Sequence, residues 1–204
     1  MAWKERLTAG KAALAKYDYE NAEYQLWEAL KDAEMFGGES IEMIETAETL
    51  ARCLMDMTKY DDAEPLMLGL ADIQQRKFGG NSIRTATTLV QLAEMYYAKG
   101  EYAKAEPFAQ SCLKIYEVNH GPQHEETVRL MSYMAYIFHA QQKFSQAEPF
   151  YEKAVAASVK TMGQNPKGAL QIINGYAALL SSTHREEQAN SLLAYAEQAQ
   201  QAVS

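Results

Sequence analysis

The stretch Tyr60-Asp61-Asp62-Ala63-Glu64-Pro65 decides the fold, because it returns twice along the chain in the same phase. The two later copies, at equal spacing, are Tyr102-Ala103-Lys104-Ala105-Glu106-Pro107 and Phe144-Ser145-Gln146-Ala147-Glu148-Pro149. Two series of alanines keep the same period of 42 positions: Ala51, Ala93, Ala135 and Ala177, and Ala63, Ala105, Ala147 and Ala189. A fixed period of this length is typical of a solenoid, in which each unit buries its apolar face against its neighbours.

One period contains two helices. The apolar residues of its first half recur at the spacing of one helix face: Leu89, Leu92, Ala93 and Tyr96. Gly100 is suited to the residue just past a helix C-terminus, so it predicts a turn. A second helix is expected from about Tyr102, with Pro107 in its first turn or so, where a missing N–H costs little. Each unit is therefore predicted to be a helix–turn–helix.

The first unit is shorter than the others by a single position, because the interval from Ala22 to Ala63 falls one short of the period. The pattern places the missing residue near Lys31 to Phe36. Glycines that keep the full period mark the turn that ends four of the units: Gly37, Gly79, Gly121 and Gly163. Atypical terminal units are expected in a capped solenoid.

These units resemble the tetratricopeptide repeat (TPR), and their length is similar to that of the kinesin light chain subgroup. The residues that carry the resemblance are Tyr60-x-x-Ala63-Glu64-Pro65-Leu66, Thr85-Ala86-Thr87-Thr88-Leu89 and Gly121-Pro122-Gln123-His124. We therefore predict an all-α, right-handed α-solenoid of about five TPR-like repeats with roughly ten helices. It is expected to form a single domain over residues 1–204, with repeats at about 1–40, 41–82, 83–124, 125–166 and 167–204.

The composition disfavours two classes of partner. The formal charge is −8, from 19 basic and 27 acidic side chains. This balance disfavours nucleic acid, whose binding needs a basic surface, and it disfavours anionic membranes. No apolar run approaches the ~20 residues of a membrane span.

Cys53 and Cys112 are far apart and form no CxxC motif, which favours free thiols in a reducing compartment and predicts a cytoplasmic protein.

The TPR resemblance implies that the first helix of each repeat lines a concave groove. The residues facing that groove should form a second stripe beside the core stripe, and in the fourth unit this stripe becomes aromatic and basic. Tyrosine and arginine are enriched in binding hot spots, and arginine can grip a carboxylate with two hydrogen bonds. The predicted peptide-binding residues are Arg52, Glu94, Tyr97, Arg129, Tyr133, Tyr136, His139 and Asn174.

The sequence offers little for catalysis. It contains no nucleophile motif, glycine-rich phosphate loop or metal signature, so we predict no enzyme, catalytic residue, metal site or cofactor. His120 and His124 are spaced like zinc ligands on a helix, but Gly121 and Pro122 between them favour a turn.

The predicted function is a non-catalytic scaffold that binds a peptide or protein segment in the concave groove. One alternative is a self-assembling, homo-oligomeric repeat module, and another is a metal-binding or enzymatic helical protein.

Overall fold

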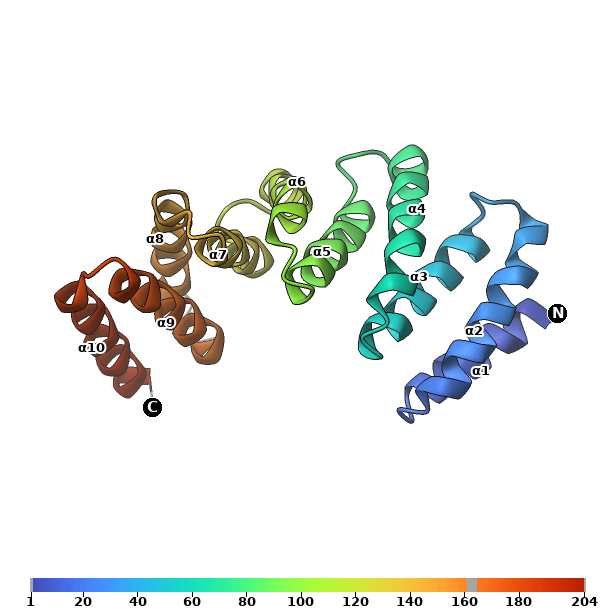
Figure 1. Ribbon diagram of the computed structural model, residues 1–204, viewed down its shortest axis with the longest axis horizontal. Helices are drawn as coiled ribbons and strands as arrows, with labels where there is room; N and C mark the ends of the chain where they lie inside the picture. The colour runs from blue at the N-terminus through green and yellow to red at the C-terminus, as the bar shows by residue number, and fades with distance from the viewer. Residues whose placement is uncertain (1, 161–164, 204) are drawn as a thin grey trace. The chain divides into compact units, whose positions relative to one another are not determined.

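The computed structural model describes residues 2–160 and 165–203, with side chains up to residue 198. These residues form ten α-helices and one short 3₁₀-helix, and no strand (Figure 1). The helices are α1 (Ala2–Leu14), α2 (Tyr19–Ala33), α3 (Ile41–Asp56), α4 (Tyr60–Phe78), α5 (Ile83–Ala98), α6 (Tyr102–His120), α7 (Glu125–Ala140), α8 (Phe144–Lys160), α9 (Pro166–Ser182) and α10 (Glu186–Val203). Within the described ranges, none of them has the length and apolar character needed to cross a bilayer.

The helices pack into two compact units, Met1–Lys99 and Gly100–Ser204. We call them the N-unit, with α1 to α5, and the C-unit, with α6 to α10. In each unit every helix packs against the next one along the chain. The predicted all-α class and the alternation of first and second helices are confirmed. The single-domain organisation stays a prediction.

Small side chains lie where neighbouring helices approach. The two periodic alanine series are almost completely buried, and none of their eight members is more than 5% exposed. Larger apolar side chains from the first helices fill the space around them, including the fully buried Leu50, Leu92 and Met134. Close packing of this kind contributes most of the stability of the fold, because each buried methylene contributes about 0.8 kcal/mol.

The turn inside each repeat has the same backbone geometry. One residue of each turn adopts a left-handed conformation, with φ between 56° and 76°: Tyr17, Thr58, Gly100, Gln142 and His184. The next amide then donates back to the first helix, as when Lys59 N–H binds the Leu54 carbonyl at 2.9 Å. This bond satisfies a carbonyl that the helix end would otherwise leave unpaired. The turn predicted at Gly100 is confirmed, with φ of +76°.

The turns between repeats use glycine. Gly37, Gly79 and Gly121 have φ between 83° and 97°, as their spacing predicts, whereas Gly163 lies outside the described residues. The shorter first repeat ends differently, because α2 stops at Ala33 and a 3₁₀-helix covers Glu34–Phe36. This segment coincides with the place predicted for the missing residue.

The prolines of the Ala-Glu-Pro motif lie deeper in their helices than expected. Pro65 and Pro107 are the sixth residues of α4 and α6, and therefore lie in the second turn. At this depth proline removes one intrahelical hydrogen bond, since only the first four N–H groups of a helix lack a partner.

The glutamate of the motif explains part of its recurrence. In each case its carboxylate pairs with a cation from the turn of the following repeat: Glu64 with Lys99 at 3.0 Å, Glu106 with Lys143 at 2.9 Å and Glu148 with Arg185 at 2.5 Å. Glu23, which precedes Tyr24 instead of proline, pairs with Lys59 at 2.6 Å. We call these four contacts the inter-repeat ion pairs. Their carboxylates are partly buried, and the four pairs recur at equivalent places between consecutive repeats.

Two glycine substitutions test the left-handed conformation at Gly100. Gly100→Ala should lower the free energy of unfolding by about 1 kcal/mol, although a Cβ there meets no atom within 4 Å, because its φ is +76°. Gly69→Ala, equally open but inside α4, should raise it by up to about 1 kcal/mol through helix propensity. Urea unfolding followed by circular dichroism tests both. Effects of the same sign would contradict the assigned conformations.

Glu106 gives the ion pairs a pH dependence. Burial alone would raise the pKa of its carboxyl, but hydrogen bonds from Lys143 and Gln141 hold that pKa below the ordinary value of 4.5. The stabilisation is therefore present above this value and is lost as the pH falls through the folded-state pKa. Glu106→Gln should lower the free energy of unfolding at pH 7. The difference in this free energy between the variant and wild type should become smaller as the pH is lowered toward about 3. Thermal unfolding across this range tests it, with the exposed Glu117→Gln as control. A difference that does not change with pH would refute this role.

Candidate functional site

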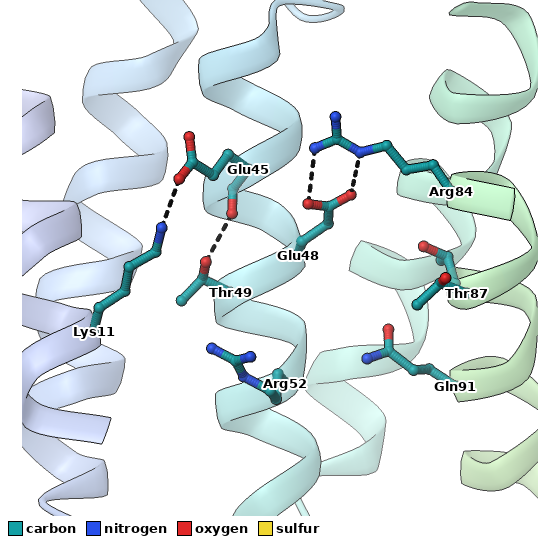
Figure 2. A pocket seen from close by; sticks show the side chains of 9 residues that line it. Lys11, Glu45, Glu48, Thr49, Arg52, Arg84, Thr87 and Gln91 are labelled. Carbon is teal, nitrogen blue, oxygen red and sulfur yellow. Dashed lines mark hydrogen bonds and ion pairs between the residues drawn. The ribbon is translucent and has the colours of Figure 1, made fainter. Parts of the chain in front are cut away.

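The N-unit contains a groove along its first helices. It has a volume of about 600 Å³, and its walls come from α1, α3 and α5 (Figure 2). The lining residues are Lys11, Glu45, Glu48, Thr49, Arg52, Arg84, Thr87, Thr88 and Gln91. The placement agrees with the prediction that first helices line a groove, and the lining is polar and charged.

Two ion pairs fix most of the charges in this groove. Lys11 of α1 reaches Glu45 of α3 at 2.5 Å, and Arg84 of α5 binds both carboxylate oxygens of Glu48, at 2.8 and 2.9 Å (Figure 2). The fully buried Gln74 adds a third hydrogen bond to Glu48, at 2.8 Å from its Nε2. Each carboxylate therefore already has a cationic partner within the groove before any ligand binds.

Arg52 differs from the other two cations. Its side chain is exposed, and among the residues that the structure describes it makes no hydrogen bond or ion pair. The Gln91 amide is directed from α5 toward α3 and likewise has no hydrogen-bond partner in the described part of the chain (Figure 2). Arg52 and Gln91 therefore present uncommitted donors to whatever occupies the groove.

In the C-unit Tyr136 makes contacts between helices, and its role in ligand binding stays a prediction. Its hydroxyl donates to the Gln171 carbonyl at 2.9 Å, and its ring meets the Tyr151 ring edge-on at a centroid distance of 5.6 Å. Gly175 of α9 permits this approach, since a Cβ there would lie 2.5 Å from Tyr136 Cε1. Tyr136 thus closes the gap between α7 and α9.

His139 joins the same aromatic cluster. Its Nδ1 lies 3.4 Å from the hydroxyl of the fully buried Tyr151, and its ring meets Phe144 edge-on at 5.6 Å. Burial lowers the pKa of the imidazole below its usual 6.5, because the charged form loses hydration. His139 is therefore neutral at pH 7.

The remaining predicted site residues are distributed over both units. Arg129 is exposed but already binds Glu126 through Nε and Nη2, at 2.9 and 2.8 Å. It also lines a smaller cavity of about 240 Å³ together with residues of α7, α8 and α9. The other members are Tyr133, half-buried on α7; Asn174, exposed on α9; and Glu94 and Tyr97, half-buried on α5. Ligand binding by all of these residues stays a prediction.

Sequence reasoning missed the partners inside the groove. Neither Lys11 nor Arg84 is among the residues predicted to line the groove. A signal was available, because Lys11 and Arg52 occupy equivalent positions of consecutive repeats once the shorter first unit is allowed for. Which acid pairs with which cation depends on how the helices lie beside one another, and the repeat pattern alone does not give this.

The two histidines between the third and fourth repeats belong to a turn. His120 is the last residue of α6, and His124 precedes α7 and accepts a hydrogen bond from Glu126 N–H. Their rings stack at 4.5 Å. In the described ranges, no group of three or more His, Cys, Asp or Glu side chains is arranged to hold a metal ion.

Comparison with known proteins identifies the family. A tetratricopeptide repeat model matches residues 42–117 and 84–158, which together cover more than half of the chain. The chain belongs to the tetratricopeptide repeat family, as its motifs predict. No match to this chain is found among curated proteins.

Solved structures agree on the fold. One of them contains nearly identical TPR-like repeats and is described as a kinesin light chain from Podosopora anserina. It superposes with a TM-score of 0.83 at 16% identity, over 97% of this chain and 94% of that chain. BtubC (BKLC) from P. vanneervenii gives 0.83 at 16% identity, over 98% and 80%. A MamA protein gives 0.73 at 14% identity, over 98% and 92%. The predicted TPR-like solenoid class is confirmed.

The close approach at Gly175 can be tested by substitution. Gly175→Ala should lower the free energy of unfolding by about 1 kcal/mol, because the clash with Tyr136 and Tyr151 outweighs the gain in helix propensity. In a Tyr136→Ala background the same substitution should cost clearly less, as expected for coupled neighbours. Thermal and urea unfolding of the four proteins of this cycle provide the measurement. An equal cost in both backgrounds would show that Tyr136 does not occupy this gap.

Proposed function

We propose that the protein is a non-catalytic interaction scaffold and that the groove of the N-unit binds an extended peptide or protein segment. The groove is formed by first helices only, along the side that varies between repeats while the buried alanines of the same helices recur. Its size and open polar lining suit a chain segment, whereas small-molecule sites are concave and mostly apolar.

The charges of the groove carry this proposal. Three cations and two carboxylates line it, and two of the cations are already neutralised by the acids. Preformed ion pairs hold the walls in place, so a ligand does not pay for ordering them. Uncommitted donors on Arg52 and Gln91 remain for main-chain carbonyls or acceptor side chains of the segment.

We also propose a cytoplasmic location and a protein or peptide as the partner. Both cysteines are free and buried, and burial raises the pKa of the Cys53 thiol to about 11, which keeps it unreactive. Free thiols of this kind suit a reducing compartment. The acidic composition argues against nucleic acid.

Blocking the groove tests the proposal. Nine-residue peptides selected on the protein from a random displayed library should bind with micromolar affinity, as expected for a small segment interface. Gln91→Trp, which places a bulky ring in the groove, should weaken their binding by at least about tenfold, since the ring and the segment compete for the same space. Fluorescence anisotropy with labelled peptides measures this effect.

The matched control is Gln75→Trp, at an exposed position of the second helix α4. It should leave the affinity unchanged. If the selected peptides bind Gln91→Trp as well as wild type, the groove is not their site. If no peptide is enriched, the proposed scaffold function fails.

A further inference from the structure

The first helices make a recurring contact across the groove-facing side. A residue in the third or fourth turn of one first helix reaches a residue in the second turn of the next. In the N-unit Lys11 reaches Glu45, and in the C-unit the Tyr136 hydroxyl reaches the Gln171 carbonyl. The members of each pair occupy equivalent positions in their repeats, so the solenoid period itself aligns them.

Arg52 occupies the position of Lys11 one repeat later, and Thr87 occupies the position of Glu45 one full period later. The period therefore aligns Arg52 with Thr87, where the previous repeat aligns lysine with glutamate. Thr87 carries no charge, and its hydroxyl donates to the Ile83 carbonyl of its own helix at 3.0 Å. The contact that neutralises Lys11 is thus absent at Arg52.

No other acid of the groove replaces the missing partner. Glu45 is held by Lys11 (Figure 2). Glu48 accepts three hydrogen bonds, two from Arg84 and one from Gln74. Arg84 is further held by the Phe78 ring, 5.0 Å below its guanidinium. Both acids thus already have partners, and Arg52 is left as the one lining cation without a counter-ion in the described residues.

We infer that Arg52 is a recognition position for a carboxylate side chain of the bound segment, an aspartate or glutamate that takes the place left by Thr87. A guanidinium matches a carboxylate with two parallel hydrogen bonds. The Gln91 amide, on the next turn of α5 after Thr87, can bind the main chain of the same segment. This inference rests on the proposed function and adds the chemistry of the partner to it.

An internal acidic side chain fits the groove better than a chain terminus does. Arg52 lies on α3, the middle of the three helices, so a segment that reaches it extends toward α1 on one side and α5 on the other (Figure 2). The acidic character of the whole chain also makes a local unpaired cation selective, because acids elsewhere on the surface repel an acidic segment from other places.

Peptide pools test this inference. The probes are labelled nine-residue pools with the central residue fixed as Glu, Gln or Lys and the other positions filled with a mixture of neutral residues. Wild type should retain the Glu pool about 3- to 10-fold better than the Gln pool, the range expected for a partly exposed charge-assisted contact. Raising NaCl from about 50 mM to about 500 mM should shrink this preference, since exposed charges are screened. A fourth pool, with a central Gln and a free rather than amidated C-terminus, separates an internal carboxylate from a terminal one.

Two variants remove the unpaired charge in opposite ways. Arg52→Gln removes the cation. Thr87→Glu places a carboxylate at the position equivalent to Glu45, where it can form an ion pair with Arg52. Both should abolish the preference for Glu over Gln while retaining the Gln pool. Thr87→Gln is the matched control and should keep the preference, because it has similar size but no charge. Arg52 and Thr87 are exposed, and circular dichroism checks that each variant folds.

The outcomes separate the two proposals. If wild type binds the Glu and Gln pools equally, or if Thr87→Glu keeps the full preference, the carboxylate role of Arg52 is wrong and the groove proposal stands. A preference that follows the free C-terminus instead of the central Glu also overturns it. If no pool is retained by wild type, both proposals fail.

Discussion

The close approach of helices at the buried alanines is the constraint on which the structure depends. Ala51 and Ala63, and their counterparts in the later repeats, are almost completely buried, and side chains this small allow neighbouring helices to pack closely. A single repeat cannot bury its own apolar face, and each therefore needs the next one. With the period set, equivalent positions of successive repeats within a unit are aligned in the same way.

That alignment explains why polar pairs come in series. The glutamate of Ala-Glu-Pro meets a cation of the next turn in all three copies of the motif, as in Glu106 with Lys143. On the other side of the first helices, Lys11 meets Glu45. The packing aligns two residues of neighbouring repeats, and the types of these residues decide whether they form an ion pair or hydrogen bond. Where an arginine meets a threonine, at Arg52 and Thr87, the same geometry leaves a charge without its partner.

Much of the fold could be predicted, because packing imposes the same residue types at the same interval. The helix pairs, the left-handed turn at Gly100 and the shortened first repeat all followed from spacing. The depth of Pro107 was misjudged, although its helix begins at Tyr102 as predicted, because the sixth residue of an α-helix already lies in the second turn. The aromatic stripe predicted around Tyr136 contains side chains that pack between helices as well as exposed ones. Their spacing along one helix does not show which side chains pack and which are exposed. Tyr136 fills space over Gly175, a contact between residues of two different repeats.

The amino-acid sequence by itself determined the repeat, its helix–turn–helix content and the side of each first helix that varies. It could do so because positions that are buried in every repeat require similar residue types, which therefore recur at a fixed interval in the sequence. Only the tertiary structure decided which charges meet. Lys11, Arg52 and Arg84 look equivalent in the sequence as cations on first helices, yet two are neutralised and one is not. The physical reason is that an ion pair depends on a few ångströms between side chains of different repeats, and the packed helices set that distance.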